Sequence, residues 1–119
     1  MNWYIAKVVF NIVSGEGNHK PQFDEQYRLI KADALEVAFQ KAKSIGISEE
    51  EIILNDKGEL VKWDFVGVSE LYAVNELSDG MELFSSIQEK HDRDAYIETV
   101  ELKSAYVQSK FESMHEKVE

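Results

Sequence analysis

The chain has 119 residues, the length of one domain, and a protein of this size buries roughly two-thirds of its unfolded surface on folding. Its formal net charge of −10 disfavours direct binding to nucleic acid or anionic membranes, whose phosphates it would repel. The absence of cysteine excludes disulfides, thiolate metal sites and a cysteine nucleophile, and the lack of a long apolar run or a signal peptide predicts a cytoplasmic protein with no membrane partner.

The first two predicted elements are strands. Residues 2–13 alternate so that one face is wholly apolar and the other is half apolar. Residues 22–32 also alternate, and the segment between the two strands holds two glycines and the only proline of the chain. This pattern predicts a β-hairpin with a long loop.

A helix is predicted over residues 33–46. Asp33 is placed to cap its start, with Glu36 completing a capping box. Gly46 suits the left-handed position just past the helix end. The apolar side chains share one stripe and are Leu35, Ala38, Phe39, Ala42 and Ile45.

A long strand with a central glycine follows a short strand and a turn over residues 55–58. In this strand, residues 61–74, the odd positions are apolar, whereas the even positions turn apolar only from Val66 onward. We expect Gly67 to mark a bulge, a sharp twist or a close approach of another backbone or ring. We also expect Val66, Val68 and Tyr72 to form a second apolar face.

A tight turn at residues 78–80 predicts one more strand, over residues 81–88, folded back against 68–77. With the preceding elements this makes an α+β fold, a twisted antiparallel sheet of about five strands with the 33–46 helix on one face.

The last segment has the spacing of a long amphipathic helix, about residues 94–116, which Asp92 or Asp94 could cap. Residues 95–103 also fit a strand, so both structures stay open for that part. We expect residues 1–119 to form a single domain with a C-terminal helical extension from about residue 93. The apolar stripe of the extension must pack on the second apolar face of the sheet or on a partner subunit, and it consists of Ile97, Val100, Val107, Phe111, Met114 and Val118.

The sequence shows no catalytic motif. Its three histidines lack the spacing of a helical zinc site, and the group His91, Asp92 and Asp94 is typical of a capped helix start. The glycines of residues 15–17 lead into a strand, whereas a phosphate loop opens into a helix. We therefore predict no catalytic residue, no cofactor and no metal.

A binding surface is predicted from aromatic residues of the sheet. Trp3, Trp63 and Tyr72, with Gly67, are the candidates for a surface or pocket that takes a ligand. Charged residues within the strands, Lys7, Glu25 and Arg28, would face such a pocket or, more commonly, solvent.

The segments NWYIAKVVF, FDEQYRLIKA, EVAFQKAKSIG, LNDKGELVKWDFVGVSELYAV and ELSDGMELFS together resemble the small bacterial proteins of the domain-of-unknown-function family numbered 4288, over about residues 2–88. The resemblance implies a bacterial cytosolic protein and this element order, and it implies no activity. The matching positions are Trp3, Tyr4, Ala6, Lys7, Glu25, Ala38, Ala42, Asn55, Gly58, Trp63, Phe65, Gly67, Val68, Leu77, Gly80 and Glu82.

Three functions are compatible with these features. Apolar residues on both faces of one sheet and a heptad-like helix favour a non-enzymatic binding or self-assembly module, a homodimer. Residues 48–92 carry twelve acidic and three basic side chains, which fits an inhibitor or immunity protein that binds a basic protein. The third function is a small-molecule-binding protein or enzyme that uses the aromatic sheet pocket.

Overall fold

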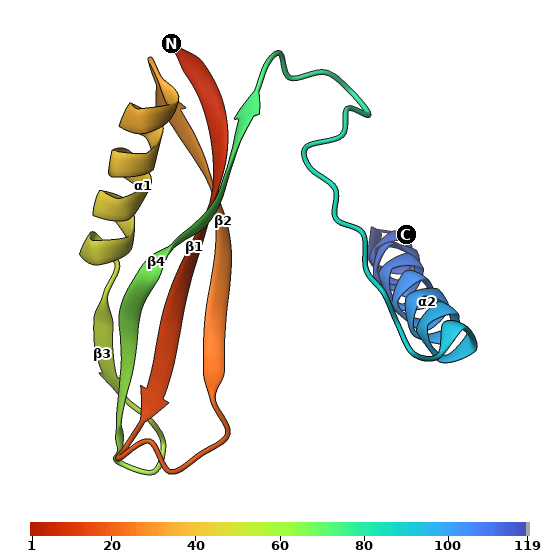
Figure 1. Ribbon diagram of the computed structural model, residues 1–119. Helices are drawn as coiled ribbons and strands as arrows, with labels where there is room; N and C mark the ends of the chain where they lie inside the picture. The colour runs from red at the N-terminus through yellow and green to blue at the C-terminus, as the bar shows by residue number, and fades with distance from the viewer. Residues whose placement is uncertain (119) are drawn as a thin grey trace. The chain divides into compact units, whose positions relative to one another are not determined.

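A computed structural model describes the backbone of residues 1–118 and the side chains of residues 1–113 (Figure 1). Met114 and Val118 of the expected apolar stripe therefore lie outside the described side chains. The contacts divide the chain into two compact units, Met1–Phe84 and Ser85–Glu119. The elements are β1 (Asn2–Ser14), β2 (Gln22–Ala32), α1 (Leu35–Ser48), β3 (Glu51–Leu54), β4 (Leu60–Val74) and α2 (Arg93–Val118).

The first unit is a curled antiparallel sheet with a helix on one face. Within the described residues the sheet has four strands in the order β2-β1-β4-β3. The long hairpin is confirmed, since β1 pairs with β2 from Asn2 opposite Ala32 to Ile12 opposite Gln22. The α+β class is also confirmed, with four strands where about five were expected.

The two faces of this sheet differ in what covers them. We call the face against which α1 packs the helix face and the opposite one the open face (Figure 1). The even-numbered side chains of β1 point to the helix face and are almost completely buried from Tyr4 to Phe10. With Ile30 and Ala32 of β2 they form the core, whose burial supplies the main stabilisation of the unit.

Helix α1 lies on the sheet through its smallest residues. Ala38, Ala42 and Gly46, each four positions apart, are its buried side, while Leu35 and Phe39 of the predicted stripe are exposed. Gly46 was expected past the helix end, but it lies inside the helix, where an added Cβ would overlap the ring of Phe65. A glycine is needed there because the ring occupies the space that a side chain would fill.

The predicted capping box of α1 is wrong. The N-cap residue is Ala34, with no side-chain cap hydrogen bond among the described atoms, and Asp33 instead lies 3.9 Å from the N-terminal amine of Met1. At the other end the helix continues to Ser48, and Glu49 N–H donates to the carbonyl of Ile45. Helix ends depend on local backbone geometry, so a sequence motif places them only approximately.

The centre of β4 contains two irregularities on either side of Gly67. Lys7 pairs with Glu70 and Val8 with Val68, which leaves Ser69 without an opposing residue on β1. A second register shift lies between the pair Val9–Gly67 and the pair Phe10–Phe65. It leaves Val66 without an opposing residue on β1. The expected bulge is thus confirmed, and it is double.

These bulges change which face some side chains occupy. Because successive residues alternate, each extra residue reverses the side on which the following ones point. Val68 was expected on the second apolar face, but it pairs with Val8 and packs against the core of the helix face. The expected close approach at Gly67 is also wrong, since no described atom lies within 4 Å of a Cβ built there.

The predicted fifth strand is absent from the described structure, in which residues 81–90 have no regular secondary structure. Such a strand would have to extend along the edge of β4 that β3 leaves free beyond Trp63. The bulges at Val66 and Ser69 interrupt the regular spacing of the backbone N–H and C=O groups along that edge. A further strand would therefore pair poorly with it.

The second unit consists of a segment without regular structure followed by α2. Residues 95–103, for which helix and strand both stayed open, are helical. Asp92 caps the start, because its Oδ1 accepts a hydrogen bond from the Ala95 N–H at 3.1 Å. In the part of the chain that the structure describes, neither helix has the length and apolar character of a membrane crossing.

Candidate functional site

The most connected group of polar side chains lies at the centre of the open face. Lys7 of β1 points there, and its Nζ lies 3.2 Å from Glu25 of β2 and 3.5 Å from Glu70 of β4. The register explains this meeting, because Lys7 is directly opposite both Tyr27 and Glu70. Three strands therefore bring one cation between two carboxylates.

Aromatic rings surround this ion pair. The hydroxyl of Tyr72 donates a short hydrogen bond of 2.6 Å to Glu70, and the hydroxyl of Tyr27 lies 3.4 Å from the same carboxylate. Phe84, from the segment after β4, stacks on both rings with centroid distances of 4.9 Å to Tyr27 and 5.7 Å to Tyr72. We call this group, Lys7, Glu25, Tyr27, Glu70, Tyr72 and Phe84, the Lys7 cluster.

The cluster stabilises the charged forms of its members. The hydrogen bond to Glu25 raises the pKa of Lys7, assisted by the charges of Glu25 and Glu70. The hydrogen bond from Tyr72 lowers the pKa of Glu70, and the same bond raises the pKa of the Tyr72 phenol. At neutral pH the group therefore holds an ammonium, a carboxylate and a neutral phenol.

These directions do not suit a nucleophilic lysine or a carboxyl that acts as general acid. A nucleophilic lysine needs a lowered pKa, and a carboxyl that acts as general acid needs a raised one. The phenol of Tyr72 is likewise less able to act as a base when its pKa rises. The Lys7 cluster has the electrostatics of an ion-pair network that fixes side chains on a surface.

The predicted binding residues separate onto the two faces. Trp3, Gly67 and Tyr72 lie on the open face, through their pairings with Val74, Val9 and Ile5. Trp63 pairs with Ile12 and points to the helix face. The structure thus assembles three of the four candidates on one side of the sheet, and a pocket shared by all four is not formed.

The neighbours of Lys7 were missed in part by sequence reasoning. Lys7 and Glu25 stood out as charges within apolar strands, but Arg28 lies on the other face, where it hydrogen-bonds Gln26. Glu70 and Phe84 carried no signal of their own. The i, i+2 pair Glu70 and Tyr72 shares one strand face, and this spacing could have indicated their contact.

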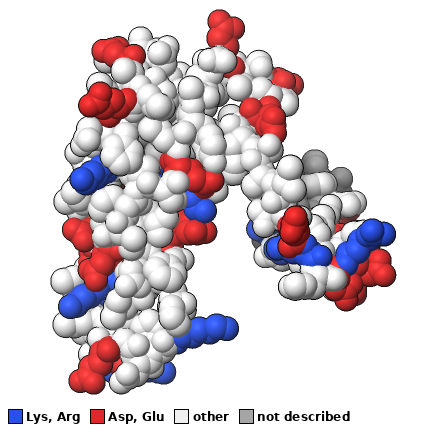
Figure 2. Space-filling model, in the orientation of Figure 1, with Lys and Arg blue, Asp and Glu red and all other residues white. Residues whose placement is uncertain are grey.

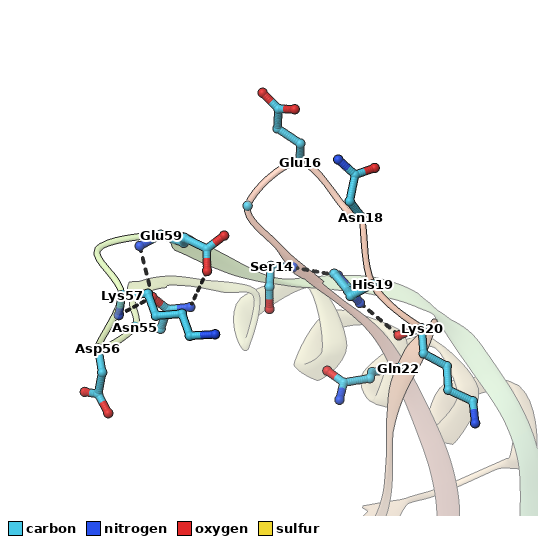
Figure 3. A pocket seen from close by; sticks show the side chains of 11 residues that line it. Ser14, Glu16, Asn18, His19, Lys20, Gln22, Asn55, Asp56, Lys57 and Glu59 are labelled. Atoms are coloured by element: carbon cyan, nitrogen blue, oxygen red, sulfur yellow. Dashed lines mark hydrogen bonds between the residues drawn. The ribbon is translucent and has the colours of Figure 1, made fainter.

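A hollow of about 950 Å³ lies between the β1–β2 loop and the β3–β4 turn (Figure 3). Three of its polar side chains, His19, Asn55 and Glu59, have local hydrogen-bond partners. The Ser14 N–H donates to Nε2 of His19, and Oδ1 of Asn55 accepts from the N–H groups of Lys57 and Glu59. These bonds fix the two turns that border the hollow.

The described residues include no group of three metal-ligating side chains. A family model described as a domain of unknown function, DUF4288, matches residues 3–85, well over half of the chain. The chain belongs to the DUF4288 family. No match was found among curated proteins or solved structures.

The DUF4288 match ends where the first compact unit ends, at residues 84 and 85. It therefore includes the sheet from Trp3 onward, α1 and every member of the Lys7 cluster, up to Phe84. Helix α2 lies outside the DUF4288 match. The family thus describes the sheet unit, and the helical unit is a separate feature of this chain.

Proposed function

We propose that this chain is a non-enzymatic binding and self-assembly module that acts as a homodimer. The observation that carries this proposal is the exposure of large apolar side chains in both compact units. On the open face, Phe23, Tyr27 and Leu29 of β2 form one row, and each is about half exposed. Along α2, Ile97, Val100, Val107 and Phe111 are exposed to a similar extent.

Tyr27 and Leu29 are neighbours on the open face, and the apolar side chains of α2 share one stripe. Isolated apolar residues are common on protein surfaces, whereas contiguous ones are typical of surfaces that contact another chain. The open-face row shares Tyr27 with the Lys7 cluster and is interrupted by Glu25, and the charged groups of the cluster would form the polar part of a contact. An apolar patch beside an ordered polar network supports binding of a protein surface.

Sedimentation velocity of the full chain tests the proposal. At about 100 µM, far above the Kd range of a micromolar dimer, we expect one species with twice the 13.7 kDa chain mass. Dilution to about 1 µM should shift the mass toward that of one chain if the association is weak. A species of one-chain mass at both concentrations would overturn the homodimer.

Neither alternative function gains a specific observation. The acidic side chains of residues 48–92 are spread from the β3–β4 turn, with Asp56 and Glu59, to the segment after β4, with Glu76 and Asp79. The 15 residues of β4 lie between them, about 50 Å of extended chain. Figure 2 accordingly shows acidic groups at several separate places, whereas a basic partner would favour one patch.

A further inference from the structure

The outer edge of the sheet at β2 is long and regular. Among the described strands β2 has one neighbour, β1, and their register runs without a shift from Asn2 opposite Ala32 to Ile12 opposite Gln22. Every second residue of β2 therefore points its backbone N–H and C=O groups away from β1. On the opposite side of the sheet, β4 carries two bulges and β3 covers one end of it. Of the two edges, that of β2 is the better template for another strand.

We propose that β2 pairs with β2 of a second copy of this chain, antiparallel and centred on Gln26, so that the two sheets continue as one. This inference rests on the proposed homodimer and assigns its contact surface. A second copy fits because β2 is complementary to itself, in charge on one face and in apolar side chains on the other. The opposed residues are Asp24 with Arg28, Phe23 with Leu29, Glu25 with Tyr27, and Gln26 with its own copy.

The charged side chains of β2 on the helix-face side support this register. Gln26 orders both of them within one copy, because its Nε2 donates to Asp24 Oδ2 at 2.7 Å and its Oε1 accepts from Arg28 Nη2 at 2.7 Å. In the pair each carboxylate lies opposite the guanidinium of the other copy, and the two-fold symmetry makes this contact twice. Since both side chains are already ordered, little conformational entropy is lost when they meet.

The open-face side of β2 gains apolar contact in the same register. Phe23 is 57% exposed and Leu29 is 53% exposed. In the pair they lie directly opposite each other, with Cβ atoms about 5 Å apart, and this removes apolar surface from water at both ends of the contact. The phenol of Tyr27 faces the carboxylate of Glu25, so these side chains meet without a like-charge contact.

Other registers lack this complementarity. A backbone group that points outward pairs only with another such group, so the two-fold axis must pass through a residue. An axis at any of the charged residues 24, 25 and 28 would place that charge against its own copy, which is destabilising. An axis at Tyr27 would set the carboxylate of Glu25 against an apolar side chain. From residue 24 to residue 28, Gln26 is the centre that avoids both faults.

Disulfide trapping tests the register, because the chain contains no cysteine. Gln26→Cys places two thiols opposite each other, with Cα atoms about 4.5–5.5 Å apart, within the range of a disulfide. Gln22→Cys is the matched control on the same face of β2, and its two Cα atoms would be about 27 Å apart because residue 22 lies opposite residue 30. In a glutathione redox buffer we expect at least about tenfold more disulfide-linked dimer from Gln26→Cys, whose thiols are held at high effective concentration. Equal trapping of the two variants would overturn the pairing.

A charge swap tests the contact between Asp24 and Arg28. Asp24→Arg alone and Arg28→Asp alone each set like charges opposite each other twice. Sedimentation between about 1 and 100 µM should therefore show a dimer Kd raised at least about tenfold. The double variant with both substitutions restores opposite charges, and we expect it to dimerise about as tightly as the wild type.

The same measurements separate the β2 pairing from the proposed homodimer. Single variants that dimerise as tightly as the wild type would refute the β2 pairing and leave the homodimer intact. A double variant that dimerises no better than the single ones would refute the register centred on Gln26. A wild-type chain that is monomeric at every concentration would refute both the pairing and the homodimer.

Discussion

The helix face and the open face are formed by the same strands, but different interactions hold them. On the helix face, Phe10, Val8 and Ala6 are at most 1% exposed and pack on other apolar groups. On the open face, the corresponding central position holds Lys7 with its two carboxylates, and the ring of Phe84 stacks on the neighbouring Tyr27. Burial of apolar surface dominates one face, and a partly exposed polar network organises the other.

The difference indicates how the two faces divide their roles. Close packing is intolerant of changes in volume, so the helix face should determine stability. A network of exposed ion pairs contributes little to stability, but it orders side chains at the surface. The predictions below test this division, since each compares a residue of the helix face with one of the open face or probes the network itself.

The largest expected effect on the free energy of unfolding is that of Phe10→Ala, and Phe23→Ala is its counterpart on the open face. Phe10 is 1% exposed and meets Phe65 edge to face with centroids 6.1 Å apart, whereas Phe23 is 57% exposed. Phe10→Ala should lower the free energy of unfolding by about 3–5 kcal/mol, because it leaves a cavity. Phe23→Ala should lower it by less than about 1 kcal/mol. Urea unfolding followed by circular dichroism measures both, and similar losses would contradict the division.

The second comparison concerns two glycines, Gly46 and Gly67. Alanine at position 46 gains about 1 kcal/mol of helix propensity, but overlap with the Phe65 ring costs up to about 3 kcal/mol, so a net loss of about 1–2 kcal/mol is expected. At position 67 the added Cβ meets no described atom, and the stability should change by less than about 1 kcal/mol.

A compensating substitution controls for the cause. Shrinking the ring with Phe65→Leu should make Gly46→Ala less harmful than it is in the wild-type background, since the two sites share one space. Thermal or urea unfolding of the four chains gives the coupling energy. Additive effects would show that the Phe65 ring is not the reason for the glycine.

These glycines also show what the sequence could and could not predict. The strand alternation and helix periodicity correctly predicted the hairpin, α1, β4 and α2, because burial of one face imposes those periods. Gly46 was placed outside the helix because glycine commonly ends helices, and the ring that it accommodates is 19 positions away along the chain. Local rules assign the element but not the tertiary contact.

The Lys7 cluster was beyond prediction for a related reason. The meeting of Lys7 with Glu70 depends on the register of β1 with β4, and the bulges at Val66 and Ser69 set that register. Neither bulged residue is a glycine, although nearby Gly67 indicated an irregularity. Phe84 lies in a segment without periodicity, so its contact with two tyrosines left no pattern.

The third prediction tests whether Phe84 truly covers the open face. Phe84→Ala removes two stacked aromatic contacts, each worth about 0.5–1.5 kcal/mol when fully formed. Because Phe84 is 36% exposed, we expect a total loss near the lower end, about 1 kcal/mol. Leu77→Ala, at a 60% exposed position of the same segment, is the control and should have almost no effect. Indistinguishable unfolding midpoints for the two variants would mean that the segment does not stabilise the sheet.

The smallest expected effect is that of Glu70→Gln, and its dependence on pH is the informative part. The pKa of Glu70 is lowered in the folded chain, chiefly by the hydrogen bond from Tyr72, so its charge stabilises the fold above the usual carboxyl range. That contribution is lost as the pH falls through the lowered pKa. The pKa of Lys7 is raised, so the contribution of its charge is complete at neutral pH and is lost only in strong alkali.

Wild type should therefore exceed Glu70→Gln in stability at pH 7, and the difference should be smaller at about pH 3, below the usual pKa of a carboxyl. Urea midpoints at the two pH values measure it, with Glu76→Gln, at an exposed position after β4, as the control. A difference that is the same at both pH values would mean that Glu70 acts through its shape or its neutral hydrogen bonds. Charge would then not organise the open face, and the two faces would differ only in how deeply their side chains are buried.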